Sequence, residues 1–248
     1  MAITQKTFAL LELDFAHRTT ATATRGRMAL LAQPHWNTIT PSMHDVLSEL
    51  SHWEGMMRFY LAGGTALALQ LGHRSSVDLD FFSETDEVSP STHSEILKHL
   101  SSPDVKVLES AWGNFVLEIN EVRTGFFSYS YPLLEMTLEL EKIRLASITD
   151  IGLMKLDALI SRASRKDFYD LYCITQRQPF DKLLAMGVQK YPYARDFEVE
   201  AIRSLTFFEN AERDTQPQLF TPIAWETIKA YFCTQAQQLA AQWLDIDL

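Results

Sequence analysis

Apolar residues recur along the chain with two different periods, and these separate a first half of mixed structure from a second half of helices. Met43, Val46, Leu47 and Leu50 recur at helical spacing, which predicts a first amphipathic helix. Short apolar runs bounded by turn residues predict strands at 58–62, 77–82, 105–108, 115–119, 122–129 and 143–146. Between these strands, helices are expected at 65–71 and 91–100.

From residue 147 onward the pattern is helical. Ser147 and Asp150 are spaced as an N-cap pair, since both can accept free N–H groups of a first helical turn. Helices are expected at 148–163, 167–177, 180–189, 196–213 and 222–244. The sequence therefore predicts an α+β protein, with a small mixed sheet within residues 35–146 and an all-α C-terminal domain over residues 147–248.

The first 34 residues lack this order. Thr19–Thr24 is a run of Thr and Ala that offers little apolar surface to bury. We therefore expect residues 1–34 to form a loosely attached extension, and Met28 is a candidate start of the chain. Glu12 and Asp14 interrupt the apolar residues 8–11, so no signal peptide is predicted.

Composition and charge narrow the class of protein. Hydrophobic residues make up 46% and charged residues 22% of the 248 residues, as in globular proteins. The apolar stretches are far shorter than the roughly 20 residues of a membrane span. The two cysteines, Cys173 and Cys233, are too few for a disulfide framework. No membrane association is expected, and the cytoplasm is the expected location.

The net charge of −10 argues mildly against a broad nucleic-acid-binding face, which is usually basic. The charge is unevenly spread, however. Residues 155–190 contain seven Lys or Arg against four Asp, whereas residues 196–248 contain three against nine acidic residues. A local phosphate-binding surface therefore stays compatible with the acidic total.

The segment Leu61–Ser83 carries the candidate chemistry. Gly63-Gly64-Thr65 begins a predicted helix directly after a strand. Glycines allow a ligand to approach the backbone closely, and the first N–H groups of a helix bind anions. Asp78 and Asp80 are two residues apart on the next predicted strand, so both carboxylates leave the same face. Two converging carboxylates bind a hard divalent cation, Mg²⁺ or Mn²⁺, which also contacts phosphates.

Either feature alone also fits an ordinary turn or strand. The combination is more informative, because an anion site beside a metal site is what phosphoryl or nucleotidyl transfer requires. Val77, Leu79, Phe81 and Phe82 flank the two aspartates and indicate a core strand. Unpaired carboxylates are costly on such a strand unless a cation joins them.

The whole segment resembles the signature of the nucleotidyltransferase AbiEii/AbiGii toxin family. This family belongs to the DNA-polymerase-β-like superfamily, whose pattern is Gly-[Gly/Ser] followed by Asp-x-Asp. Here thirteen residues separate Gly64 from Asp78. The likeness continues in residues 143–172 and more faintly in 205–212 and 221–232. It implies a nucleotidyltransferase core at residues 35–146 that is completed by residues from the helical domain.

The resemblance also assigns roles to individual residues. Gly63, Gly64 and Thr65 would hold the phosphates of an NTP, and Asp78 and Asp80 would bind the metal ions. Lys155 matches the family's essential lysine and would lie near the triphosphate. The alternative is that Lys155 is a solvated residue on the exposed side of its helix. Asp167 and Asp170 fall in the family's Lys-Asp-x-x-Asp-Leu segment, which supplies a further acid, and Asp170 is favoured.

Other basic residues have weaker assignments. Arg74 is a candidate phosphate ligand, and His73 before it is expected to be a structural hydrogen-bonding residue. Arg162, Arg165 and Lys166 fit an acceptor-binding groove and also fit basic residues that stabilise a helix terminus.

The chain departs from the superfamily pattern at one position. Many polymerase-β-like enzymes place a third catalytic aspartate on a later strand, and the matching position here is Gly125. The general base is then expected to be Asp167 or Asp170, with Glu118 as a poorer candidate.

By the resemblance, the chain transfers a nucleotide from an NTP to RNA, for example a tRNA end, as the toxin of a toxin–antitoxin or phage-defence system with an antitoxin as partner. A small-molecule nucleotidyltransferase of the antibiotic-modifying kind is the alternative within the enzymes. A non-catalytic descendant that binds nucleotide or protein is the alternative outside them. The acidic C-terminal segment with Trp225, Tyr231, Phe232 and Trp243 would supply its surface, unless these residues simply pack between helices.

Overall fold

A single mixed sheet forms the centre of the first half of the chain in the computed structural model, which describes residues 29–243. Its order is β1-β7-β8-β2-β3-β6-β5-β4. The strands are β1 Ala29–Leu30, β2 Tyr60–Leu61, β3 Asp78–Ser83, β4 Val105–Ala111, β5 Asn114–Ile119, β6 Val122–Ser128, β7 Leu138–Leu140 and β8 Ile143–Leu145. β3 is central: it pairs antiparallel with β2 and parallel with β6.

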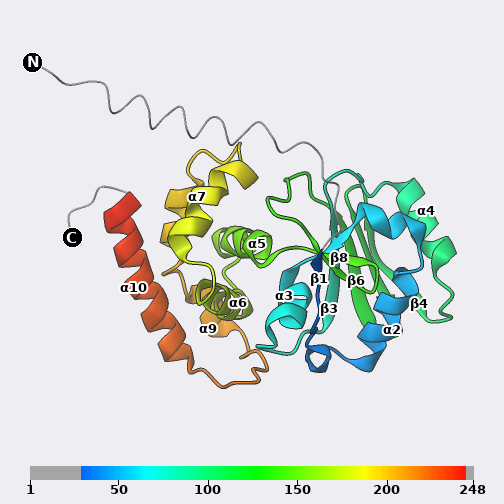
Figure 1. The fold of residues 1–248 in the computed structure, drawn as a ribbon, viewed down its shortest axis with the longest axis horizontal. Helices are drawn as coiled ribbons and strands as arrows, with labels where there is room; N and C mark the ends of the chain where they lie inside the picture. Colours follow the sequence, from blue (N-terminus) through cyan, green and yellow to red (C-terminus); the bar gives the residue numbers. More distant parts are fainter. Residues whose placement is uncertain (1–28, 244–248) are drawn as a thin grey trace, which may run out of the picture.

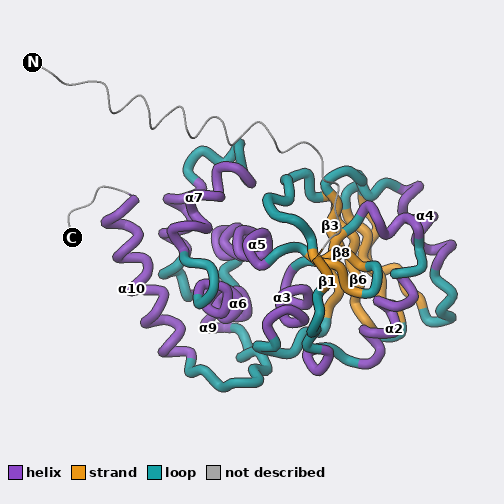
Figure 2. Tube along the Cα trace, viewed as in Figure 1, coloured by secondary structure: helices purple, strands orange, loops and turns teal. Residues whose placement is uncertain are grey.

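Helices lie on both sides of this sheet (Figures 1 and 2). The helices are α2 Pro41–Leu50, α3 Gly63–Leu71, α4 Pro90–His99, α5 Ile148–Ser161, α6 Arg165–Thr175, α7 Phe180–Lys190, α8 Phe197–Ser204, α9 Glu209–Arg213 and α10 Trp225–Trp243, with short 3-10 helices η1 Trp36–Thr38 and η2 Glu54–Arg58. α2 and α4 cover one side, whereas α3 and the C-terminal helices α5–α10 gather on the other (Figure 1).

The alternation of β3 follows from these two layers. Leu79 and Phe81 are fully buried, and Phe81 stacks on Phe126 of β6 with ring centroids 5.2 Å apart. Asp78 and Asp80 point to the opposite face and are only partly buried. This is the face toward α3 and α5, so the strand directs its apolar side into the core and its carboxylates toward the C-terminal helices.

The predicted α+β class, with a mixed sheet followed by helices, is confirmed, and three local predictions were wrong. Strand β7 was missed, because three residues are too few to show a period. The helix expected at 196–213 is broken between α8 and α9, where Phe208 turns inward against Phe168. Val77 is 68% exposed and precedes β3 rather than belonging to a core strand.

The predicted extension 1–34 overlaps the described residues only at its end. There Ala29 and Leu30 form β1, which pairs in parallel with β7 at the edge of the sheet. The backbone N–H of Leu31 also donates to the Glu139 carbonyl at 2.9 Å. Residues 1–28 lie outside the described residues.

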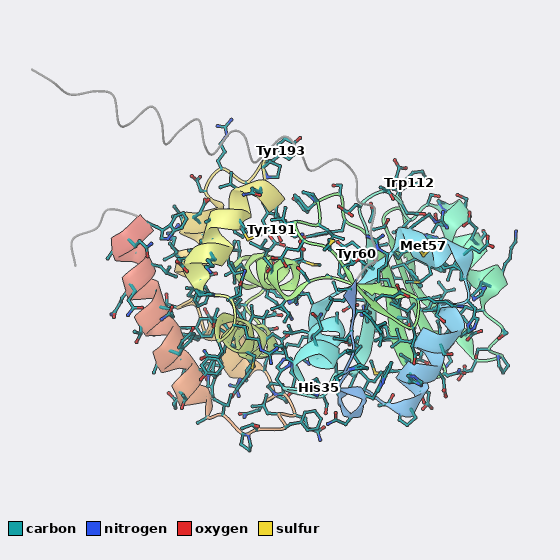
Figure 3. All side chains as sticks on the ribbon, in the orientation of Figure 1. His35, Met57, Tyr60, Trp112, Tyr191 and Tyr193 are labelled. Atoms are coloured by element: carbon teal, nitrogen blue, oxygen red, sulfur yellow. The ribbon has the colours of Figure 1, made fainter. Side chains whose placement is uncertain are left out.

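Tyrosines join the sheet to the C-terminal helices. The hydroxyl of Tyr129, just after β6, lies 2.9 Å from the hydroxyl of Tyr191 at the end of α7. Figure 3 shows Tyr191 between α7 and the sheet, and Tyr60 of β2 inside the molecule, whereas Tyr193 and Trp112 lie at its periphery. Tyr193 and Trp112 are 91% and 67% exposed.

Asp150 organises the beginning of the helical half. The predicted cap is confirmed, because the Ser147 hydroxyl accepts the Asp150 N–H at 2.9 Å. The Asp150 carboxylate in turn accepts the N–H groups of Leu134 and Glu135 at 3.0 and 3.1 Å. Lys190 at the end of α7 donates to the same carboxylate at 2.9 Å, and both side chains of this ion pair are fully buried.

We expect Lys190→Ala to destabilise the protein by about 3–5 kcal/mol, because it leaves the buried Asp150 charge without its cation. Lys182→Ala, at an exposed position of the same helix, should change the free energy of unfolding by less than about 0.5 kcal/mol. Urea unfolding of both variants measures the difference. Equal stabilities would contradict a structural role for the buried pair.

Candidate active site

Helix α3 begins with two glycines that bring its backbone close to other groups of the site. Gly63 adopts φ +65°, in the left-handed region that favours glycine, and a Cβ there would lie 3.5 Å from a carboxylate oxygen of Asp80. A Cβ on Gly64 would lie 2.2 Å from a guanidinium nitrogen of Arg74. A side chain at position 64 would therefore displace Arg74. Gly63, Gly64 and Thr65 line a cavity together with Asp78 and Asp80, and the first N–H groups of a helix have no carbonyl partner within it.

Thr65 has a structural role that the sequence did not indicate. Its hydroxyl donates to the backbone carbonyl of Asp78 and lies 2.8 Å from the Ser76 hydroxyl. The side chain is 1% exposed. Thr65 thus fixes the first turn of α3 to the start of β3, which leaves only its backbone N–H to contact a phosphate.

Asp78 and Asp80 stand as a carboxylate pair on one face of β3, as predicted. Burial and the neighbouring Asp78 carboxylate raise the pKa of Asp80 above its ordinary value. Among the described residues, its ion-pair partner is Arg123 of β6, whose guanidinium nitrogen lies 3.9 Å from Asp80. Two carboxylates in mutual repulsion without a close cation form a set of oxygen donors that fits a divalent metal ion.

Asp170 of α6 is enclosed by donors from two segments, the turn before β3 and helix α5. Arg74 donates to both of its carboxylate oxygens at 2.6 and 2.8 Å, and His73 lies 2.8 Å away. The Lys155 ammonium of α5 lies 2.6 Å from it. Burial alone would raise the pKa of Asp170, but Lys155 and Arg74 hold it well below its ordinary value. His73 is confirmed as a structural hydrogen-bonding residue.

Asp167, one turn earlier, is bound in the same way. Lys155 donates to it at 2.8 Å, Arg162 at 2.9 and 3.0 Å, and the Ser164 hydroxyl at 2.6 Å. Burial opposes ionisation here too, yet Lys155 and Arg162 lower the pKa of Asp167 to about 2. Together His73, Arg74, Lys155, Arg162, Asp167 and Asp170 form one ionic network, which is buried except for the exposed Arg162 at its edge.

This network changes the roles expected of the two aspartates. Both carboxylates are fully buried and already accept several donors, so they offer no free oxygen to a metal ion or a substrate proton. The geometry does not fit the predicted use of Asp170 or Asp167 as base or metal ligand. Instead they position Lys155 and Arg74, which line the cavity beside the carboxylate pair.

Two cavities meet at the carboxylate pair. The first, of about 410 Å³, lies between the start of α3 and helix α5 and is lined by Gly63, Gly64, Arg74, Lys155 and Asp157 among others. The second, of about 740 Å³, lies beyond β3 toward β6 and is lined by Arg123, Phe127, Lys166 and Asp214 among others. Asp78 and Asp80 line both.

The position of the missing third acid is occupied by an aromatic ring. Gly125 of β6 is the register partner of Asp80. A Cβ on Gly125 would lie 2.4 Å from the Phe127 ring and 3.4 Å from an Asp80 oxygen, so this ring lies across the glycine beside the carboxylate. Glu118 on β5 pairs with Lys106 at 2.7 Å and lines neither cavity, which removes it as a base candidate.

Within residues 29–243, no cluster of three or more His, Cys, Asp or Glu side chains has the geometry to hold a metal ion. The carboxylate pair would supply two ligands to a metal ion bound there. This number suits Mg²⁺, which is commonly held by one or two carboxylates together with water and substrate phosphates.

A glycine-led helix start beside two carboxylates on the adjacent strand is an arrangement for transferring nucleotides, and comparison with known proteins agrees. The model of the family "Nucleotidyl transferase AbiEii toxin, Type IV TA system" matches residues 45–110 and 117–232. The chain belongs to this family of toxins and is a nucleotidyltransferase.

Individual proteins that resemble this chain share between 16% and 35% of their residues with it. An uncharacterised protein of Aquifex aeolicus is 35% identical over 178 residues, which is 70% of this chain and 84% of that protein. Similar solved structures include the nucleotidyltransferase toxin MenT4 of Mycobacterium tuberculosis, at 19% identity and TM-score 0.48 over 80% of this chain and 87% of that one. A putative nucleotidyltransferase of Helicobacter pylori matches at 16% identity and TM-score 0.49, over 83% and 95%.

Several site residues were not singled out from the sequence. Arg123, Phe127 and Asp214 line the second cavity, and Asp157 lines the first. The alternation of side chains along the predicted strand 122–129 places residues 123, 125 and 127 on one face. This alternation was the sequence signal that could have identified Arg123 and Phe127. No described helix has both the length and the apolar character to cross a membrane.

The network predicts a pH dependence of stability. The pKa of Asp167 is lowered from 3.8 to about 2 on folding. The ionised carboxylate therefore contributes fully to the free energy of unfolding above pH 3.8, and this contribution is lost as the pH falls toward 2. The stability difference between the native protein and Asp167→Asn should therefore shrink by about 2 kcal/mol between roughly pH 6 and pH 2. Denaturant unfolding at several pH values measures it, and a constant difference would contradict the assignment.

Proposed function

We propose that the protein transfers a nucleotide from an NTP to an RNA acceptor with the help of divalent metal ions. The observation that carries this proposal is that Asp78 and Asp80 face both cavities at once. A nucleotide in the first cavity and an acceptor in the second would meet beside this pair. Mg²⁺ or Mn²⁺ held by Asp78 and Asp80, when bound, would neutralise the charge that develops on the phosphate oxygens.

The triphosphate fits the first cavity. Its oxygens would accept the free N–H groups at the start of α3, from Gly63 to Thr65. Two protons of the Lys155 ammonium are directed to Asp167 and Asp170, so the third is left for a phosphate. Arg74 uses three of its five N–H donors on Asp170 and the Ser75 carbonyl. The other two remain for the substrate.

The reaction is an in-line displacement. An acceptor hydroxyl oxygen bonds to the α-phosphorus, the bond from that phosphorus to the bridging oxygen breaks, and pyrophosphate leaves. The proton of the hydroxyl passes to a carboxylate of the Asp78/Asp80 pair or to water, because these are the described acids that face both cavities.

Charge in the second cavity favours an anionic acceptor. Once metal ions neutralise Asp78 and Asp80, the remaining charged groups are the cations Arg123, Arg162 and Lys166 against one acid, Asp214. This balance attracts a phosphodiester backbone. A polycationic antibiotic acceptor would be repelled, so we favour RNA, modified in the cytoplasm by a toxin that a partner antitoxin restrains.

The alternative of a non-catalytic, protein-binding descendant needs an accessible aromatic surface on α10. This surface is largely used for packing inside the protein. Trp225 and Phe232 are 8% and 0% exposed. Both rings contact Phe168 of α6, at centroid distances of 5.6 and 5.1 Å. The aromatic residues of α10 thus hold the helical region together, which favours the catalytic reading.

We expect tight NTP binding to require Mg²⁺ or Mn²⁺ and to be lost in Asp78→Ala/Asp80→Ala, because the pair supplies the protein ligands of the metal. Isothermal titration with and without EDTA measures this. The double variant Asp181→Ala/Asp196→Ala removes the same charge at exposed positions and should bind as the native protein does. Metal-dependent binding would be contradicted if the NTP affinity were unchanged both in EDTA and in Asp78→Ala/Asp80→Ala.

Lys155→Ala should reduce turnover by about 10²–10³, roughly 3–4 kcal/mol of lost charge stabilisation in the transition state. Because Lys155 is also a buried partner of Asp167 and Asp170, the variant should melt at a lower temperature as well. Turnover is therefore measured well below that temperature. Met154→Ala, which alters the same cavity wall without removing a charge, is the control. Native turnover in folded Lys155→Ala would exclude contact with the triphosphate.

A further inference from the structure

An aromatic platform borders the carboxylate pair on the side of the second cavity. Phe127 of β6 and Phe82 of β3 are register partners on neighbouring strands, with ring centroids 5.3 Å apart. Both are only partly buried and both line the second cavity. The ring of Phe82 also contacts Tyr129 edge-on, with ring centroids 5.5 Å apart. This contact helps to fix the position of Phe82.

Gly125 determines how close this platform lies to the reacting atoms. Any side chain at that position would meet the Phe127 ring at 2.4 Å, so the glycine allows the ring to lie flat along the strand. The same Cβ position is 3.4 Å from Asp80. The aromatic surface therefore begins immediately beside the carboxylate at which an acceptor hydroxyl must arrive.

Cations stand around the platform. Arg123 precedes Phe127 by four residues on the same face and is half-exposed, and Lys166 at the start of α6 is exposed. A π surface beside separated positive charges matches a nucleotide, whose base can stack while its phosphate is paired. An aliphatic or polycationic ligand would use neither feature.

We propose that Phe127, supported by Phe82, stacks the base of the terminal nucleotide of a single-stranded RNA 3′ end. Arg123 and Lys166 pair with the phosphates that lead to this nucleotide, and its ribose hydroxyl reaches the Asp78/Asp80 pair. The proposal rests on the proposed function, and it adds the residues that hold the terminal nucleotide of the acceptor beside the carboxylate pair. Stacking reads the π face of a base and no particular hydrogen-bonding edge, so the site accepts all four bases.

The test uses the full chain and two fluorescent RNA hairpins, one with an unpaired 3′ overhang and one with a blunt end, each at one low salt concentration. Phe127→Leu keeps an apolar side chain but removes the ring, whereas Phe127→Tyr keeps the ring. Phe207→Ala, at a phenylalanine that is 50% exposed and outside both cavities, is the control. Fluorescence anisotropy gives the RNA affinities, and calorimetry gives the affinity for NTP with Mg²⁺.

We expect Phe127→Leu to bind the overhang hairpin about 5- to 100-fold more weakly, as for the loss of one base–aromatic stack. Phe127→Tyr and Phe207→Ala should stay near the native affinity. All variants should keep the native affinity for NTP with Mg²⁺, and the native protein should prefer the overhang to the blunt hairpin with each of the four terminal bases.

Native affinity of Phe127→Leu for the overhang would overturn the proposal, and so would an equal loss for both hairpins or for NTP. Absence of any overhang binding by the native protein would overturn it too. Because NTP binding is measured separately, metal-dependent NTP affinity in that case would leave the nucleotidyl-transfer function standing without the RNA platform.

Discussion

The buried ionic network around Asp170 is the interaction on which the rest of the site depends. This carboxylate is fully buried, and donors from the turn before β3 and from α5 compensate the cost of burying its charge. Removing one partner of such a network leaves an uncompensated charge in the interior. The sheet and the C-terminal helices are therefore bound to each other at the place where the first cavity lies between them.

The network also separates two kinds of carboxylate. Asp167 and Asp170 are saturated with donors, and their low pKa values keep them ionised as fixed counter-charges. Asp78 and Asp80 face the cavities without an equally close cation. The protein thus uses two saturated carboxylates to orient Lys155 and Arg74, whereas the partly buried Asp78/Asp80 pair keeps the oxygens that would bind metal ions under the proposed function.

The ring of Phe127 across Gly125 gives the site a lower density of negative charge than three acids on adjacent strands would give. Fewer acids leave the second cavity net positive once the pair is neutralised, because Arg123 and Lys166 remain. The same replacement of a charge by a ring places an apolar surface beside the carboxylate pair. The proposed acceptor preference therefore depends on one local feature of β6.

Sequence by itself determined what depends on neighbouring residues: the shared face of Asp78 and Asp80, the glycine start of α3 and the Ser147 cap of α5, because backbone periodicity and capping act within a few positions. Tertiary structure alone decided what surrounds Asp170. Its partners His73 and Arg74 lie 97 and 96 positions away. Periodicity can show that such a side chain is buried, but only packing decides whether it meets a metal ion or a guanidinium.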